Sequence, residues 1–313
     1  MRAIVQTELG GPEVLHLSEV DRPVPGPTEV LVRVRAAGVN PVDWKVRRGG
    51  GFLGTPPFTV GWDVSGEVVE LGTGVTRFAP GDEVYGMPRF PREAAAYAEF
   101  VTAPSRHFAR KPAALDHVGA AALPLAGLTA WQSLVDTAGI GPGQRVLVHA
   151  AAGGVGHLAV QIAKARGAYV LGTASAAKHE FVRGLGADEV IDYTSVDFAV
   201  AVRDVDVVLD TLGGEVTTRS LSTLRPGGIL VLIVGAGAAS TLAPAAAERG
   251  VRVAGLLVEP DHAGLAELSR LVQDGQLRPA VAATFPLAQA AQAHELGETN
   301  RTAGKIVLAN AGW

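Results

Sequence analysis

The stretch from Gly143 to Lys164, GQRVLVHAAAGGVGHLAVQIAK, carries the clearest chemical signal in this chain. A short apolar run, Arg145–His149, leads into a glycine-rich turn and then into a helical pattern that continues to Arg166. Glycine lets a backbone turn tightly and approach a ligand, and the free N–H groups at a helix N-terminus attract an anion. The pattern therefore predicts a pyrophosphate-binding turn at Gly153, Gly154, Val155 and Gly156, with Ala151 replacing the first glycine of the usual G-x-G-x-x-G.

The end of the next strand indicates which dinucleotide would bind. A domain that selects NAD presents Asp or Glu about 20 residues after the glycines, where the acid holds the ribose hydroxyls. This chain has Ser175 at that place and Lys178 shortly after it, with no acid between Leu171 and Ser175. A hydroxyl and an ammonium suit the extra phosphate of NADP(H), which an acid would repel. We expect NADP(H); a lysine on a solvated helix surface is the alternative interpretation of Lys178.

The elements around this turn alternate between strand and helix. Tyr169–Gly172, Val205–Asp210 and Ile229–Val234 are apolar, strand-like runs, and Ala176–Leu185 has a helical pattern. This alternation predicts βαβ units and a parallel sheet. A longer helical pattern, Val118–Ala138, comes before them.

The first third of the chain has a different texture. Glu29–Ala36 alternates apolar and charged residues, and Gly66–Leu71 and Glu83–Tyr85 are further strand-like segments between Pro- and Gly-rich turns. Short strands with such turns predict a partly closed β-barrel or a sandwich. The C-terminal part has helical patterns at Leu265–Asp274 and Leu287–Glu298 and a final strand at Lys305–Leu308.

Composition excludes several classes of function. The 313 residues favour two domains, and 48% hydrophobic against 19% charged residues is typical of a globular chain. The net charge of −4 gives no reason to expect nucleic acid or an acidic membrane as a partner. The absence of cysteine excludes disulfides, iron–sulfur clusters, thiolate-bound zinc and a thiol nucleophile. The N-terminal residues have no signal-peptide pattern, so we expect a cytoplasmic protein.

The 22 residues from Gly143 to Lys164 resemble, position by position, the signature of the quinone oxidoreductase (ζ-crystallin-like) group of the medium-chain dehydrogenases/reductases. Three other segments, Val39–Gly49, Leu125–Ala130 and Gly304–Leu308, also resemble family segments at family positions, so the resemblance covers essentially the whole chain. The matching positions of the signature are Gly143, Gln144, Leu147, Ala151, Ala152, Gly153, Gly154, Gly156, Gln161 and Lys164.

The resemblance implies an α/β fold with two domains. A GroES-like, partly closed β-barrel would comprise residues 1–120 and 262–313, with the C-terminal tail completing it. A doubly wound Rossmann domain, residues 121–261, would be inserted between these parts and bind NADP(H). In the family the active cleft lies between the two domains.

The resemblance also implies roles for individual residues. The family binds the cofactor with Ser or Thr, Lys and a Tyr after the third strand, which correspond to Ser175, Lys178 and Tyr193. Thr129 matches a threonine at the nicotinamide, and Lys305 matches a lysine near the cofactor phosphates. A charge at a strand edge is the alternative interpretation of Lys305.

Zinc-dependent relatives carry a cysteine in the early barrel and a Gly-His-Glu motif. Here Asn40 stands near the first position, and Gly61-Trp62-Asp63 replaces the motif. We therefore expect no metal and disfavour simple alcohol dehydrogenation, which needs zinc to polarise the alcohol oxygen. Hydride transfer to a quinone or an α,β-unsaturated carbonyl remains, because conjugation in the acceptor spreads the incoming charge.

The candidate hydrogen-bond or proton donors are Asn40 and Lys45, on the turn after the early strand that faces the cleft in the family. Lys45 as an ordinary exposed lysine is the alternative. Trp44 and Phe52 are candidates for lining an apolar substrate pocket, with core packing as the alternative and the better interpretation for Trp62. Nearby Asp43 is interpreted as a turn or capping residue. Tyr85 and Tyr97 could also donate a proton, but nothing in the sequence aims them.

The favoured function is an NADPH-dependent reductase of quinones or enones with small-molecule substrates. Two alternatives stay open: an enoyl reductase dedicated to one biosynthetic pathway, because the chain also resembles enoyl reductase domains of polyketide synthases, and a non-catalytic NADPH-binding protein. We also expect a homodimer formed through edges of the Rossmann sheet, because Ile229–Val234 and Val251–Val258 are apolar and strand-like.

Overall fold

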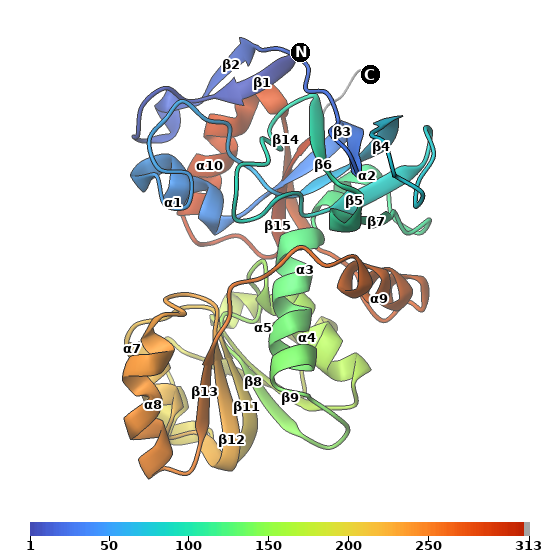
Figure 1. The fold of residues 1–313 in the computed structure, drawn as a ribbon. Coiled ribbons are helices and arrows are strands. Elements are labelled where there is room, and N and C mark those ends of the chain that lie inside the picture. The colour runs from blue at the N-terminus through green and yellow to red at the C-terminus, as the bar shows by residue number, and fades with distance from the viewer. Residues whose placement is uncertain (310–313) are drawn as a thin grey trace. The chain divides into compact units, whose positions relative to one another are not determined.

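The computed structural model describes residues 1–309, and the chain divides into two compact units. The barrel unit comprises Met1–Leu128, Glu259–Asp274 and Pro279–Trp313, of which residues 310–313 lie outside the described part. The Rossmann unit comprises Thr129–Val258 and Gly275–Arg278. The boundaries after residues 128 and 258 lie close to those expected after residues 120 and 261. Figure 1 follows the chain through both units.

The barrel unit is built on a seven-stranded sheet in the order β14-β15-β3-β4-β5-β7, in which β6 also pairs with β3. Strand β15 comes from the C-terminal part and pairs antiparallel with the end of β3, so the tail completes the sheet as expected. A separate hairpin joins β1 to β2. The strands are β1 (Arg2–Val5), β2 (His16–Glu19), β3 (Glu29–Val39), β4 (Val64–Leu71), β5 (Glu83–Gly86), β6 (Phe100–Pro104), β7 (Phe108–Arg110), β14 (Val281–Pro286) and β15 (Lys305–Ala309).

The helices that lie wholly in this unit are α1 (Pro41–Gly49), α2 (His117–Ala121), α9 (His262–Gln273) and α10 (Ala290–Glu298), and α3 (Pro124–Trp131) begins in it and ends in the Rossmann unit. Close to the end of β3, Gly38 allows two other segments to approach the strand. A Cβ atom on Gly38 would lie 2.4 Å from the Ala121 carbonyl oxygen and 2.7 Å from the Asp63 carboxylate. Glycine at this position therefore lets Asp63 lie against the end of β3, next to Asn40.

The segment after β3 is a helix, where a turn was expected, so that part of the prediction was wrong. Asn40 precedes α1 in an extended conformation, Pro41 occupies the first helical position, and Asp43 accepts a 2.7 Å hydrogen bond from the Asn40 backbone N–H. Proline at the first position and an acid at the third are both typical of helix starts. A helix of nine residues is too short for the helical period to stand out in the sequence.

The Rossmann unit has a six-stranded parallel sheet in the order β10-β9-β8-β11-β12-β13. Helices α4 and α5 lie on one side of it, and α7 and α8 on the other (Figure 1). This is the doubly wound arrangement expected. Its elements are β8 (Arg145–Val148), α4 (Gly156–Ala165), β9 (Tyr169–Ala174), α5 (His179–Gly184), β10 (Glu189–Asp192), α6 (Phe198–Ala201), β11 (Val205–Asp210), α7 (Glu215–Ser220), β12 (Leu224–Leu232), α8 (Ala238–Glu248) and β13 (Arg252–Gly255).

The long helix expected at 118–138 is interrupted. Helix α2 ends at Ala121, α3 runs over Pro124–Trp131, and a wider π-helical segment covers Gln132–Thr137. Pro124 explains the break, because proline has no N–H to continue a helix but fits the start of a new one.

The sheet order also corrects the expected edges. Strand β12, which contains most of the apolar run Ile229–Val234, lies inside the sheet between β11 and β13 and is no edge. Strand β13 is an edge, and its residues are partly exposed. Along residues 1–309, no helix has both the length and the apolar character needed to cross a bilayer.

Candidate functional site

The glycine-rich turn joins β8 to α4 as expected. Gly156 begins α4, and a Cβ atom added to it would lie 2.2 Å from the Ala150 carbonyl oxygen. At Gly153 the corresponding distance, also to the Ala150 oxygen, is 3.1 Å. Ala150 itself has a φ of 47°, in the left-handed region that non-glycine residues rarely adopt. The turn is thus as tight as a phosphate cradle requires, and the residues present fit a dinucleotide pyrophosphate at the start of α4.

The alanine in place of the first glycine is accommodated by a glycine elsewhere. Ala151 is fully buried, and its methyl group would lie 2.7 Å from a Cβ on Gly172 of β9. The missing side chain at Gly172 therefore makes room for the extra methyl at Ala151. This exchange explains how the turn keeps its shape although it departs from the G-x-G-x-x-G pattern.

Two buried side chains that the sequence did not single out hold the start of the turn. Thr173 of β9 accepts a hydrogen bond of 3.1 Å from the Ala150 N–H, and its carbonyl accepts one of 2.9 Å from Ala151. The His149 ring lies between the Thr173 hydroxyl, at 3.3 Å, and the Ser220 hydroxyl, at 2.9 Å. Burial lowers the pKa of His149 to about 4, so the ring is neutral at pH 7.

Ser175, Lys178 and Tyr193, the residues expected around the 2′-phosphate, follow the carboxyl ends of the neighbouring strands β9 and β10. Ser175 follows β9 and Tyr193 follows β10, and the last residues of these strands, Ala174 and Asp192, are paired. Lys178 lies on a short 3₁₀ turn after Ser175 and is half-buried, and this burial lowers its pKa. Tyr193 is 60% exposed. The parallel register therefore brings Ser175, Lys178 and Tyr193 to the same end of the sheet.

In the barrel unit, three buried ionisable side chains converge on Asn40. The Asn40 backbone N–H donates to Asp43, and its side-chain Nδ2 donates to the Asp63 carboxylate at 2.8 Å. The Asn40 Oδ1 accepts a hydrogen bond from the Lys305 ammonium. An ammonium only donates and a carboxylate accepts, so these partners fix which end of the amide faces which neighbour. Asn40, Asp43, Asp63 and Lys305 are between 0% and 3% exposed.

The Asp63 carboxylate is fully engaged. Its Oδ1 accepts a 2.6 Å hydrogen bond from the Leu125 N–H, and its Oδ2 lies 3.3 Å from the Lys305 Nζ as well as accepting from Asn40. Burial raises the pKa of Asp63, and the Lys305 ammonium opposes that shift. The Lys305 Nζ also donates to the Val39 carbonyl at 3.0 Å, so it has three acceptors for three N–H bonds.

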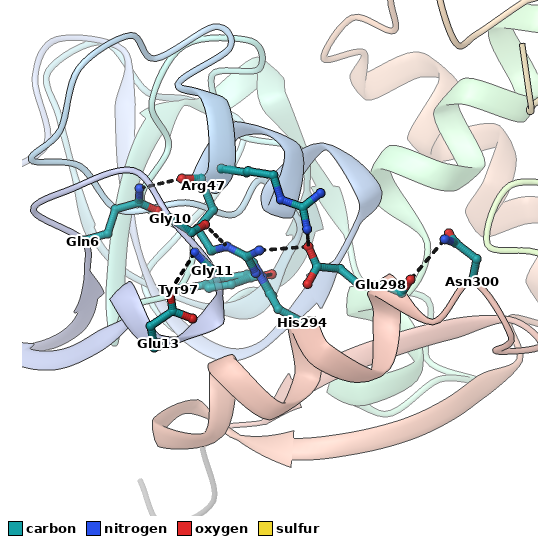
Figure 2. Close-up of polar contacts among 10 residues, drawn as sticks. Gln6, Gly10, Gly11, Glu13, Arg47, Tyr97, His294, Glu298 and Asn300 are labelled. Carbon is teal, nitrogen blue, oxygen red and sulfur yellow. Dashed lines mark hydrogen bonds and ion pairs between the residues drawn. The ribbon is translucent and has the colours of Figure 1, made fainter. Parts of the chain in front are cut away.

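A second buried chain of side chains starts from Asp43 and ends at the surface. The Tyr97 hydroxyl lies 2.8 Å from Asp43 and 3.1 Å from the His294 Nε2, and Arg47 donates to the His294 Nδ1 at 3.1 Å. Figure 2 shows Arg47, Tyr97 and His294 directed toward one another, with Glu298 of α10 beyond Arg47. Arg47 also donates to Glu298 at 2.8 Å, and exposed Arg48 contacts the same carboxylate.

Arg47 fixes the donor and acceptor of each hydrogen bond from Arg47 through His294 and Tyr97 to Asp43. A guanidinium only donates, so the His294 Nδ1 accepts and its Nε2 carries the hydrogen. The His294 Nε2–H then donates to the Tyr97 oxygen, which leaves the Tyr97 O–H to donate to Asp43. These hydrogen bonds link the positive Arg47 to Asp43 through two neutral side chains, His294 and Tyr97. They cannot carry a proton to the surface, because a guanidinium does not release its proton.

The pKa shifts agree with this arrangement. Burial, reinforced by Arg47, lowers the pKa of His294 to about 3, so His294 is neutral. Burial raises the pKa of Asp43 to about 7, although hydrogen bonds from Asn40 and Tyr97 counteract the shift. The Asp43 Oδ1 has no hydrogen-bond partner among residues 1–309, and this oxygen is where a proton would bind.

The other candidates in the barrel unit make none of the hydrogen bonds around Asn40 described above. Lys45 is on the exposed side of α1, whereas Asp43 and Arg47 are buried. Trp44 is half-buried with its ring edge-on to His294 at 6.1 Å, against α10. Phe52 is 52% exposed and meets the ring of Phe90 at 5.7 Å. Trp62 is fully buried and donates to the Arg92 carbonyl, which confirms core packing.

The resemblance also assigns Thr129 and Lys305 to the cofactor, and the structure shows what surrounds each of them. Thr129 is buried on α3, within the region expected to be helical. Lys305 has all its N–H bonds directed at Val39, Asn40 and Asp63 within the barrel unit. The proposed contact of Lys305 with the cofactor phosphates therefore stays a prediction, and these three contacts show what the ammonium binds within the barrel unit.

The donor atoms present do not fit a catalytic zinc ion. The chain has no cysteine, and Asn40 and Trp62 stand where relatives carry ligands. Within residues 1–309, no three His, Asp or Glu side chains are grouped as a metal site would require. Neither an amide nor an indole replaces a thiolate or imidazole as a zinc ligand.

Two family descriptions match the chain. Residues 26–113 match the alcohol dehydrogenase GroES-like domain, and residues 185–308 match a family described as zinc-binding dehydrogenase. A 2-haloacrylate reductase from a Burkholderia species is 36% identical, with 98% of this chain and 98% of that protein aligned.

Solved structures agree over the full length. The quinone oxidoreductase from Coxiella burnetii superposes with a TM-score of 0.93 at 39% identity, and the match covers 99% of both chains. Mycobacterial Rv1454c in complex with NADPH superposes with a TM-score of 0.88 at 33% identity, covering 99% of this chain and 100% of that one.

Proposed function

Because the chain belongs to the zinc-free quinone oxidoreductase group of the medium-chain dehydrogenase/reductase superfamily, we propose that it reduces quinones or α,β-unsaturated carbonyl compounds with NADPH. Its relatives are oxidoreductases, and the names of two of them point to conjugated acceptors: a quinone and a haloacrylate. The observation that carries the proposal is the fixed Asn40 amide, together with the lack of any group of three potential metal ligands among residues 1–309. An amide donor suits an acceptor that needs no metal to become electrophilic.

The proposed cofactor is NADPH in preference to NADH. The glycine turn and the start of α4 would hold the pyrophosphate, and Ser175, Lys178 and Tyr193 would surround the 2′-phosphate at the neighbouring sheet end. Asp192, the residue before Tyr193, accepts hydrogen bonds from the N–H and hydroxyl of Thr194 in its own turn. Thr129 is proposed to contact the nicotinamide half.

The bound dihydronicotinamide would supply a hydride, two electrons with one hydrogen, to the β-carbon of an enone or to a quinone. Negative charge then develops on the acceptor's oxygen. Asn40, whose amide cannot rotate freely, would donate an N–H to that oxygen, and a proton from solvent would complete the reduction. Trp44 and Phe52 remain proposed contacts for the apolar part of the acceptor.

An acceptor panel tests this function against its two alternatives. Purified protein is mixed with NADPH and, separately, with simple quinones, simple enones and no acceptor, and the loss of absorbance at 340 nm is followed. We expect oxidation with quinones or enones. An enzyme dedicated to one pathway would ignore simple quinones, and a non-catalytic NADPH-binding protein would oxidise NADPH with none of them.

Lys45 stays a proposed second donor, and its exposed position favours solvent as the proton source. Lys45→Ala would lower enone turnover about 10²-fold if the ammonium acts as a general acid. Unchanged turnover on every acceptor would remove Lys45 from the reaction. The proposed zinc independence is tested in the same assay, since a chelator should leave the rate unchanged.

We also propose that the chain forms a homodimer through β13, the partly exposed edge strand of the Rossmann sheet. Light scattering at micromolar concentration tests this, and a monomer would contradict it. A cytoplasmic location stays a prediction.

A further inference from the structure

The charges around Asn40 exceed what a helix start requires. One acceptor for the Asn40 backbone N–H, supplied by Asp43, is enough to begin α1. The side-chain amide nevertheless has a buried ammonium on one end and a buried carboxylate on the other. Burying such a pair is expensive, and apolar side chains in its place often leave a protein as stable or more so. The Lys305–Asp63 pair is therefore poorly explained by stability alone.

We infer that Lys305 is a positioning residue for the proposed reduction, which holds and polarises the Asn40 amide so that Asn40 can stabilise negative charge on the acceptor's oxygen. This inference rests on the proposed function and assigns Lys305 a role on the acceptor side of the reaction. The resemblance would place the same residue at the cofactor phosphates.

The hydrogen-bond inventory supports this role. The Asn40 Nδ2 has two hydrogens, and Asp63 takes one, which leaves the other to donate. The Lys305 ammonium on Oδ1 draws electron density from the amide and strengthens the remaining N–H as a donor, because hydrogen bonds in series polarise one another.

Preorganisation supports it as well. Asn40 is 1% exposed, and its amide cannot exchange its oxygen and nitrogen ends without placing NH₂ against an ammonium and oxygen against a carboxylate. A donor fixed in this way and shielded from water needs no reorganisation when charge develops, which is the condition for effective oxyanion stabilisation. Lys305 and Asp63 come from segments 242 residues apart, so the fold itself assembles the arrangement.

The test separates acceptor chemistry from cofactor binding. Lys305→Gln removes the charge but keeps an N–H donor. We expect kcat for an enone at saturating NADPH to fall about tenfold or more, less than the 10²–10³ for removing a whole oxyanion donor. The NADPH dissociation constant, measured by fluorescence titration, should change less than about twofold. Lys305→Arg, which keeps the charge, should retain most of the turnover.

Lys111 provides a matched control within the same unit. Its side chain is 7% exposed, it pairs with Glu83 at 3.2 Å, and it donates to the Leu115 carbonyl. Lys111→Gln should leave both kcat and NADPH binding unchanged. Because Lys305→Gln leaves Asp63 without its cation and could impair folding, the double variant Lys305→Gln/Asp63→Asn removes both charges together. It should show the same loss of kcat.

The outcomes are distinguishable. Unchanged kcat in Lys305→Gln or in the double variant would overturn the inference. A tenfold weaker NADPH binding with kcat preserved at saturation would return Lys305 to the cofactor phosphates, also against the inference but in favour of the proposed function. If the wild-type protein fails to oxidise NADPH with any of the quinones and enones tested, both the proposed function and this inference are refuted.

Discussion

The buried chain from Arg47 to Asp43 makes a prediction about stability and pH. Tyr97→Phe removes the hydroxyl that accepts from His294 and donates to Asp43. At pH 5, below the pKa of about 7 that burial gives Asp43, the carboxyl group is protonated. The main loss is then the acceptor of the His294 N–H, about 1–3 kcal/mol for a buried group left unsatisfied.

At pH 8 the loss should be larger. Asp43 is then about 90% ionised, and a hydrogen bond to a charged group contributes roughly 1.5–3 kcal/mol where a neutral one contributes about 0.5–1.5. The sign follows from linkage: the Tyr97 hydroxyl lowers the pKa of Asp43 in the folded state, so removing it raises that pKa and favours the protonated form. The cost of Tyr97→Phe should therefore grow by about 1–1.5 kcal/mol as the pH rises from 5 to 8.

Tyr85→Phe is the matched control. Tyr85 is equally buried, and its hydroxyl donates to the Leu265 carbonyl beside Ser269, neither of which titrates. The measurement is a urea titration of each variant at both pH values, followed by amide hydrogen exchange in β3 and α1, because a chain of two units need not unfold in one step. If the two variants lose the same free energy at pH 5 and at pH 8, Asp43 is not the titrating partner of Tyr97.

Two further predictions concern the Rossmann unit. Gly156→Ala places a methyl group 2.2 Å from the Ala150 carbonyl oxygen and should weaken NADPH binding at least about tenfold. Gly184→Ala is the control, because nothing lies within 4 Å of its new atom, and it should bind NADPH normally. Equal NADPH titration curves for the two variants would refute a pyrophosphate site at the glycine-rich turn. Lys178→Ala removes a charge-assisted bond of roughly 1.5–3 kcal/mol and should raise the NADPH dissociation constant about tenfold or more while NADH binding changes little. Equal weakening of both cofactors would exclude a contact with the 2′-phosphate.

The sequence predicted the Rossmann unit well, because its signals are local. The apolar runs of β8, β9 and β11 and the glycines before α4 each lie within a few consecutive residues. The start of α1 was not predicted although Asn40, Pro41 and Asp43 stand at capping positions, because a turn was expected after the early strand. The break before α3 could have been read from Pro124.

The polar interior of the barrel could not be predicted in this way. Arg47 and His294 are 247 residues apart in the chain, and nothing in the sequence near Arg47 indicates His294 as its partner. Lys305 was recognised, but its position on β15 opposite the end of β3 depends on the pairing of Ile306 with Val39, which no local pattern fixes. The pairing of β15 with β3 therefore places Lys305 next to Asn40, which the sequence around Lys305 does not indicate.

The central claim is that hydride passes from NADPH to a conjugated acceptor. The most direct measurement uses NADPH carrying deuterium on the transferring face of C4, with a simple enone as acceptor and NMR analysis of the isolated product. We predict one deuterium per molecule at the β-carbon and solvent hydrogen at the α-carbon. Product without deuterium at the β-carbon, or NADPH consumed with no reduced product, would contradict the account.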